Sequence, residues 1–132
     1  MNVEVRYFSK FGNTKRIAEA IAEGANVTAK TVDEPASEYV DVMFLGGAPY
    51  ANVMDPELRK FAEGLSGDNV GRVVLFTTSN WSRRTVLSLR KILKKKNIKV
   101  DDDYFYAHML NVSGRIEAAK EFGKSKIENE ND

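Results

Sequence analysis

The sequence contains no cysteine and only one histidine, His108, among its 132 residues. Without thiols the chain can form no disulfide, no thiolate-bound zinc site or iron–sulfur cluster, and no cysteine nucleophile. A single imidazole excludes a metal site built from several histidines, so we expect no metal. No apolar run approaches the roughly 20 residues that cross a bilayer. The first residues are typical of a strand rather than of a secretion signal, so we expect a cytoplasmic protein with no membrane partner.

The composition is that of an ordinary globular domain, with 42% hydrophobic and 30% charged residues. We therefore predict one domain spanning residues 1–132. The formal net charge of +1 hides a basic run at 83–99, which holds eight Lys or Arg residues and no acidic one. Such a run is typical of a solvated helix face or of a surface that meets an acidic partner. Because no aromatic residue stands between these charges, we expect no nucleic-acid partner.

Apolar runs alternate with amphipathic stretches along the whole chain. The predicted strands cover residues 3–8, 27–32, 40–45, 73–76 and 98–106, and a brief turn or helix is expected at 35–38. The predicted helices begin at Thr14, Pro56 (with Asp55 as N-cap), just after a capping Ser82, and at Gly114, and residues 128–132 are expected to fray. This alternation predicts a three-layer, doubly wound α/β fold around a five-stranded parallel sheet.

In such folds, ligands bind beyond the carboxyl ends of the strands. The loop after the first predicted strand, Ser9-Lys10-Phe11-Gly12-Asn13-Thr14, places small and polar residues at a helix N-terminus. Unpaired backbone N–H groups and the helix dipole favour an anion there. The same residues also suit a simple turn and helix cap, so this motif alone leaves both interpretations open.

The segment Tyr-Phe-Ser-Lys-Phe-Gly-Asn-Thr-Lys-Arg-Ile-Ala resembles the phosphate loop of the flavodoxins, and the order of elements agrees over nearly the whole chain. The resemblance implies that the loop holds the phosphate of flavin mononucleotide (FMN) through Ser9, Phe11, Gly12, Asn13 and Thr14, with Lys10 as a further contributor. Phe11 stands where the family often has a hydroxyl residue, so the backbone N–H must serve alone at that position.

Two later loops fit the same resemblance. Gly46, Gly47, Ala48, Pro49 and Tyr50 follow a buried strand, and the resemblance implies that they lie along the flavin ring with Tyr50 stacked on it. Thr77, Thr78, Ser79, Asn80 and Trp81 follow the next strand, and they would offer an aromatic side chain and backbone groups to the flavin. The alternatives are a surface tyrosine packed on Pro49 and a tryptophan in the core or an interface.

The resemblance implies a monomeric electron carrier that binds FMN and resembles a short-chain flavodoxin, rather than a turnover enzyme. No side chain is expected to be catalytic, and redox partners would dock transiently, through the basic run at 83–99. Two alternatives are an FMN-dependent NAD(P)H:quinone-type reductase and a flavodoxin-like domain that has lost its cofactor. His108 is expected to be structural, and Asp101, Asp102 and Asp103 are expected to be solvated.

Overall fold

The computed structural model describes residues 1–131, with side chains described to residue 128. In this part of the chain, five parallel strands form one sheet in the order β2-β1-β3-β6-β7. They are Val3–Tyr7 (β1), Ala29–Thr31 (β2), Val40–Gly47 (β3), Val70–Ser79 (β6) and Val100–His108 (β7). The helices are Asn13–Gly24 (α1), Pro56–Glu63 (α2), Arg84–Lys95 (α3) and Ile116–Asn131 (α4), with a 3₁₀ turn at Ser113–Arg115 (η1).

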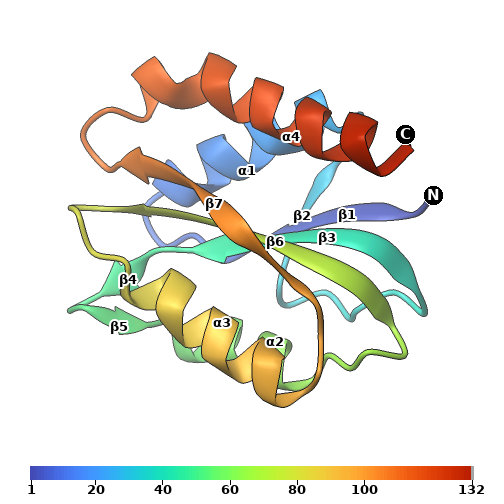
Figure 1. Ribbon diagram of the computed structural model, residues 1–132. Coiled ribbons are helices and arrows are strands. Elements are labelled where there is room, and N and C mark those ends of the chain that lie inside the picture. Colours follow the sequence, from blue (N-terminus) through green and yellow to red (C-terminus); the bar gives the residue numbers. More distant parts are fainter. Residues whose placement is uncertain (132) are drawn as a thin grey trace.

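Helices cover both faces of the sheet, α1 and α4 on one and α2 and α3 on the other (Figure 1). Neighbouring residues of the central strands point to opposite faces, so each strand contributes to two cores. Phe44 and Phe76 pack under α1 and α4, whereas Leu45 and Leu75 pack under α2 and α3. The predicted doubly wound, three-layer fold is confirmed. None of the helices among the described residues is long and apolar enough to cross a membrane.

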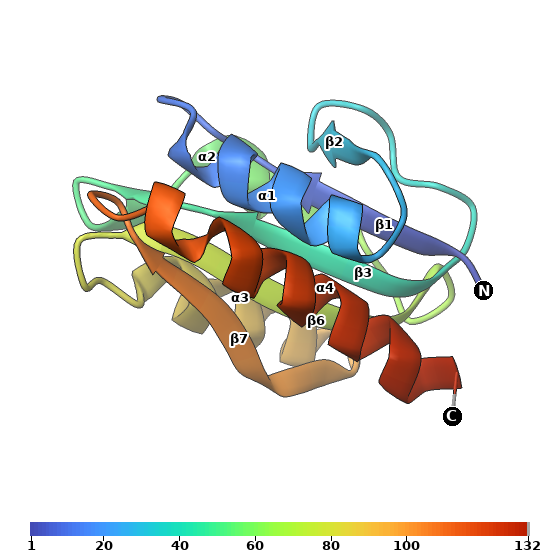
Figure 2. The same ribbon diagram turned by 90° about the horizontal axis from the view of Figure 1, so that it is seen from above.

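Two glycines let α1 and α4 touch through their backbones, and the helices lie side by side over the sheet (Figure 2). A Cβ on Gly24 would lie 1.9 Å from the carbonyl oxygen of Lys120. A Cβ on Gly123 would lie 2.2 Å from the carbonyl oxygen of Ile21. Alanine favours a helix interior by about 1 kcal/mol over glycine, but here backbone stands where the methyl group would go. The close approach of the two helices therefore depends on these glycines.

The loop after β3 contains a small hairpin that the sequence did not predict. Pro49–Tyr50 (β4) and Val53–Met54 (β5) pair antiparallel. Ala51 and Asn52 form the turn with φ of 53° and 59°, the left-handed pair of a type I′ turn. Neither turn residue is glycine, so the usual sequence signal for such a turn is absent.

Several element boundaries differ from the prediction. β6 is longer than predicted, and 35–38 contains no helix. Asp55 caps α2 as expected, accepting from the Glu57 N–H at 2.8 Å. Ser82 lies one residue before the N-cap of α3, although its hydroxyl accepts from the Arg84 N–H at 3.2 Å. The expected frayed tail is wrong for residues 128–131, which continue α4; Asp132 lies outside the described residues.

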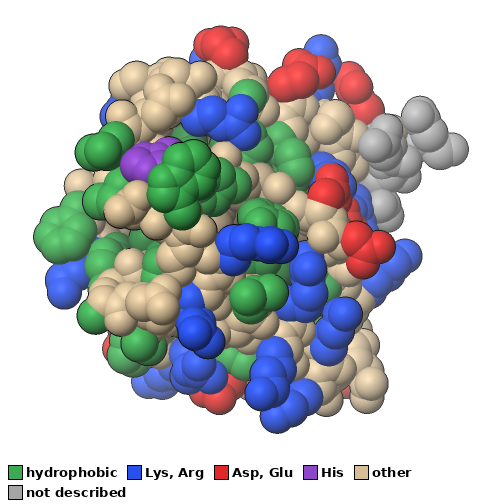
Figure 3. All heavy atoms as spheres, turned by 60° about the vertical axis from the view of Figure 1, so that its left-hand side comes forward, with side chains coloured by type: hydrophobic (Ala, Val, Ile, Leu, Met, Phe, Trp, Pro, Cys, Tyr) green, Lys and Arg blue, Asp and Glu red, His purple; other side chains and the backbone are tan. Residues whose placement is uncertain are grey.

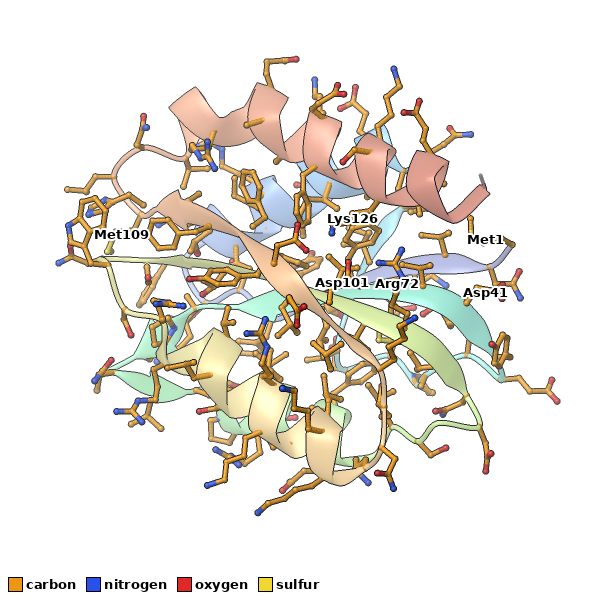
Figure 4. The ribbon with its side chains drawn as sticks, viewed as in Figure 1. Met1, Asp41, Arg72, Asp101, Met109 and Lys126 are labelled. Atoms are coloured by element: carbon orange, nitrogen blue, oxygen red, sulfur yellow. The ribbon has the colours of Figure 1, made fainter. Side chains whose placement is uncertain are left out.

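An ion-paired cluster at the amino ends of β6 and β7 corrects the expectation that Asp101 is solvated (Figure 4). Its carboxylate accepts from Arg72 at 2.6 Å and from Lys126 at 2.8 Å. Lys126 also reaches Asp103 at 2.6 Å. Burial alone would raise the pKa of Asp101, but the hydrogen bonds and charges of Arg72 and Lys126 outweigh it and hold that pKa below its usual value. The cluster thus joins β6, β7 and α4.

The lowered pKa of Asp101 predicts an acid-sensitive contribution to stability. Because the folded-state pKa is depressed, the contribution is fully present above the unfolded-state value of about 4 and is lost as pH falls through the folded-state value. Asp101→Asn should therefore lower the free energy of unfolding at pH 7 by about 1–3 kcal/mol, with the deficit vanishing toward pH 2. Urea unfolding between pH 2 and 7 measures this, with exposed Asp102→Asn as the matched control. A deficit independent of pH would contradict it.

Candidate functional site

The carboxyl ends of β1, β3, β6 and β7 meet at one edge of the sheet, on the left in Figure 1. A pocket of about 390 Å³ opens there, next to the point between β1 and β3 where the strand order reverses. The side chains around it come from all three loops that the sequence pointed to, and from the loop after β7. They are Ser9, Phe11, Asn13, Thr14, Ala48, Pro49, Tyr50, Asn52, Thr78, Ser79, Asn80, Ser82 and Met109.

The first loop brings an open helix N-terminus to this pocket. Gly12 is the N-cap of α1 with a φ of 97°, and none of the described side chains caps the helix. The first intrahelical bond runs from the Arg16 N–H to the Gly12 carbonyl at 3.1 Å, so the N–H groups of the preceding helical residues have no intrahelical acceptor. Ser9 accepts from the Gly12 N–H at 3.0 Å and shapes the turn. Gly12 and Lys10 themselves do not line the pocket.

Two hydroxyls at the end of β6 fasten the other loops to this strand. Thr14 and Thr78 share a buried hydrogen bond of 2.7 Å between their hydroxyl oxygens. The neighbouring Thr77 donates to the carbonyl of Gly47 at 2.7 Å. Thr78 lines the pocket, whereas Thr77 is buried and does not line it.

Tyr50 forms one wall of the pocket and is held in place on several sides. Its hydroxyl accepts from the Lys10 N–H at 2.7 Å. The rings of Phe8 and Phe11 meet it edge-on at 6.4 and 5.8 Å, and the Lys10 ammonium lies 5.3 Å from its ring centre. Burial, then Asp55, raises the pKa of Tyr50 against the lowering effect of the Lys10 bond. Tyr50 is therefore a neutral, fixed aromatic wall at physiological pH.

The two predicted glycines do not line the pocket. Gly46 and Gly47 are buried residues of β3, and their carbonyls accept from Phe8 at 3.2 Å and from Thr77 at 2.7 Å. A Cβ on Gly46 would stand 2.3 Å from the carbonyl oxygen of Phe76. Gly46 therefore allows the close contact between β3 and β6.

Trp81 lies beside the pocket, not among its lining residues, and is 75% exposed. Its indole stacks on Tyr106 at 6.1 Å and meets His108 at 4.9 Å. The Tyr106 hydroxyl accepts from the backbone N–H of Trp81 at 2.9 Å and donates to the Ser79 carbonyl at 3.0 Å. These bonds hold Trp81 at a φ of 69°, which is unusual for a bulky residue. His108 bonds Asn80 at 3.0 Å, as expected of a structural histidine.

Three lining residues were not found from the sequence: Asn52, Ser82 and Met109. The Ser82 hydroxyl donates to the Asn52 side-chain oxygen at 2.7 Å and so links the second and third loops. Met109 directly follows β7, and the rule that ligands lie beyond the carboxyl ends of strands would have found it. Among the residues with described side chains, no group of three or more His, Asp or Glu gathers to hold a metal ion.

Comparison with solved structures identifies the fold of this chain. A flavodoxin from the domain Archaea matches with a TM-score of 0.78 and 21% identity, covering 98% of both chains. Oxidised flavodoxin 1 from Bacillus cereus matches with a TM-score of 0.76 and 17% identity, covering 96% of this chain and 98% of that one. The chain has the flavodoxin fold.

The flavodoxin fold also occurs as part of longer proteins. The flavodiiron protein from Giardia intestinalis matches with a TM-score of 0.69 and 18% identity, and the match covers 96% of this chain but 36% of that one. No family model and no curated protein matches this sequence. The likeness is therefore carried by the flavodoxin fold, at low sequence identity.

The two hydrogen bonds of the Tyr106 hydroxyl predict that removing this oxygen loosens the third loop. Tyr106→Phe keeps the ring under Trp81 but removes two hydrogen bonds, so the free energy of unfolding should fall by about 1–3 kcal/mol. The anisotropy of Trp81 emission should fall as well, because its backbone loses its anchor. Tyr104→Phe is the matched control, since the Tyr104 hydroxyl has no hydrogen bond within the described residues. Unchanged stability and anisotropy in Tyr106→Phe would contradict this role.

Proposed function

We propose that this chain binds FMN without a covalent bond and carries electrons between other proteins. The observation that carries the proposal is the uncapped N-terminus of α1, which opens on a pocket at the switch point of the sheet. Solved flavodoxins of the same fold support it. The pocket, about 390 Å³ in volume, lies in the size range of small-molecule sites. It also weighs against the alternative in which the fold has lost its ligand.

The first loop fits the phosphate of FMN. The free N–H groups at the start of α1 and the positive end of the helix dipole suit a dianion. Ser9 and Asn13 add polar side chains beside them. Lys10 is exposed and adds a positive charge near the loop. Phe11 turns its ring to Tyr50 and offers no hydroxyl, so its backbone N–H would be the donor to the phosphate at that position.

The rest of the pocket fits the flavin ring. Tyr50, Pro49 and Met109 provide apolar walls, and Asn80 and Thr78 provide polar groups. FMN supplies the one- and two-electron chemistry when bound. The chain would orient the ring between these groups, with Tyr50 as one wall. The indole of Trp81 stacks on Tyr106 in this structure. Contact between Trp81 and the flavin therefore stays a prediction.

The phosphate loop predicts selectivity between two flavins. The protein should bind FMN at least about a hundredfold more tightly than riboflavin, because charge-assisted hydrogen bonds to phosphate contribute about 1.5–3 kcal/mol each. Asn13→Ala should weaken FMN about tenfold and leave riboflavin nearly unchanged. Calorimetric titration of the flavin-free protein measures both affinities.

Lys15→Ala is the matched control, because Lys15 is exposed on the same helical turn and outside the pocket lining. Thr14→Ala is less suitable, since it also breaks the bond to Thr78. Equal affinities for FMN and riboflavin in the unmodified protein would overturn the proposal.

A further inference from the structure

A second hollow lies between α2 and α3, on the face of the sheet opposite α1 and α4. It is a groove of about 610 Å³ lined by five basic side chains. Arg59 comes from α2, and Arg84, Lys91, Lys95 and Lys96 come from α3 and the residue after it. None of the five forms an ion pair within the described residues, and Glu63 is the single acidic residue among the groove lining.

Two other members of the basic run, Arg83 and Arg90, make contacts within the fold instead of lining the groove. Arg83 lies over the ring of Tyr104 at 5.6 Å. Arg90 donates to the carbonyls of Asp101 at 3.1 Å and of Asp102 at 2.9 Å. These bonds tie α3 to the edge strand β7. Arg83 and Arg90 therefore stabilise the fold. The positive charge available to a partner lies in the groove.

The groove has apolar as well as basic lining. Leu87 and Ile92 line it, and Leu87 is 52% exposed. On α3, Arg84, Leu87 and Lys91 follow one another at spacings of three and four and so share one face. Twelve helical residues extend over about 18 Å. This face matches a helical segment in which acidic residues flank an apolar one.

The groove begins where the pocket ends. Ser82 lines the pocket, and the next residue but one, Arg84, lines the groove and donates its N–H to the Ser82 hydroxyl at 3.2 Å. Figure 3 shows Lys and Arg side chains gathered on the same face as the single histidine, below it. A protein segment lying along α3 therefore ends beside the pocket mouth.

We propose that the groove between α2 and α3 docks an acidic, amphipathic helical segment of a partner protein. Glu63 also lines the groove, and together with Leu87 it favours a protein over the evenly charged backbone of a nucleic acid. The inference rests on the proposed function in one respect: docking here brings the redox group of the partner to the pocket. The charge complementarity itself does not depend on flavin.

A labelled peptide tests the docking surface. The probe is a fluorescein-labelled, helical 14-residue peptide of Leu, Ala and Glu, with a Lys-for-Glu version as its counterpart. Fluorescence anisotropy at about 0.1 M salt should show saturable binding of the acidic peptide only, weakening steeply as salt rises. Lys91→Glu with Lys95→Glu should weaken this binding about tenfold or more, because two attractions become repulsions.

The matched control reverses Lys94 and Lys99 to Glu, two exposed residues outside the groove lining, with the same change in net charge. It should weaken the peptide by less than about threefold, because neither side chain lines the groove and each acts on the bound peptide only through solvent, where salt screens charges. Equal losses in the two double variants would overturn the proposal. Tighter, groove-dependent binding of a single-stranded oligonucleotide of equal charge would also overturn it.

The two proposals fail separately. The FMN titration of the Lys91→Glu, Lys95→Glu variant should match that of the unmodified protein, because neither residue lines the pocket. Loss of peptide binding with normal FMN binding supports the docking surface. Absence of FMN binding with normal peptide binding would refute the proposed function and leave the docking surface standing.

Discussion

Two adjacent hydroxyls at the carboxyl end of β6 hold the candidate site together. Neighbouring strand residues point to opposite faces, so Thr78 reaches Thr14 at the start of α1 while Thr77 reaches the Gly47 carbonyl at the end of β3. The three loops around the pocket thus share one strand as their anchor. The approach of β3 to β6 in turn needs Gly46, where a side chain would meet the backbone of Phe76. The position of the pocket follows from these close contacts.

The sheet, its two helical layers and the first loop could be predicted because each depends on local signals: continuous apolar runs, amphipathic stretches and a polar loop before a helix. The hairpin at 49–54 could not, because Ala51 and Asn52 adopt positive φ without a glycine. The sequence predicts a solvated Asp101 because the partners of its carboxylate lie 29 and 25 residues away. Contact between Trp81 and the flavin stays a prediction, and no sequence signal indicates that its ring stacks on Tyr106. Contacts between residues that lie far apart in the sequence produce no periodic pattern from which they could be predicted.

Positive charge is used in two ways in this molecule. Inside the pocket it comes from backbone N–H groups at the start of α1, which lack intrahelical acceptors and lie at the positive end of the helix dipole. Outside, it comes from Lys and Arg side chains in the groove between α2 and α3. The first suits a small dianion held in fixed geometry, and the second suits a partner met transiently and screened by salt. A net charge of +1 conceals both.

The central claim is that the phosphate of FMN lies at the N-terminus of α1. Titration of FMN into the ¹⁵N-labelled protein, followed by amide NMR, tests it most directly. We predict the largest amide shifts at residues 10–15, with smaller shifts in the other pocket loops. Riboflavin should shift those other loops but leave 10–15 nearly unmoved. Unchanged amides at 10–15 in saturating FMN would contradict the claim.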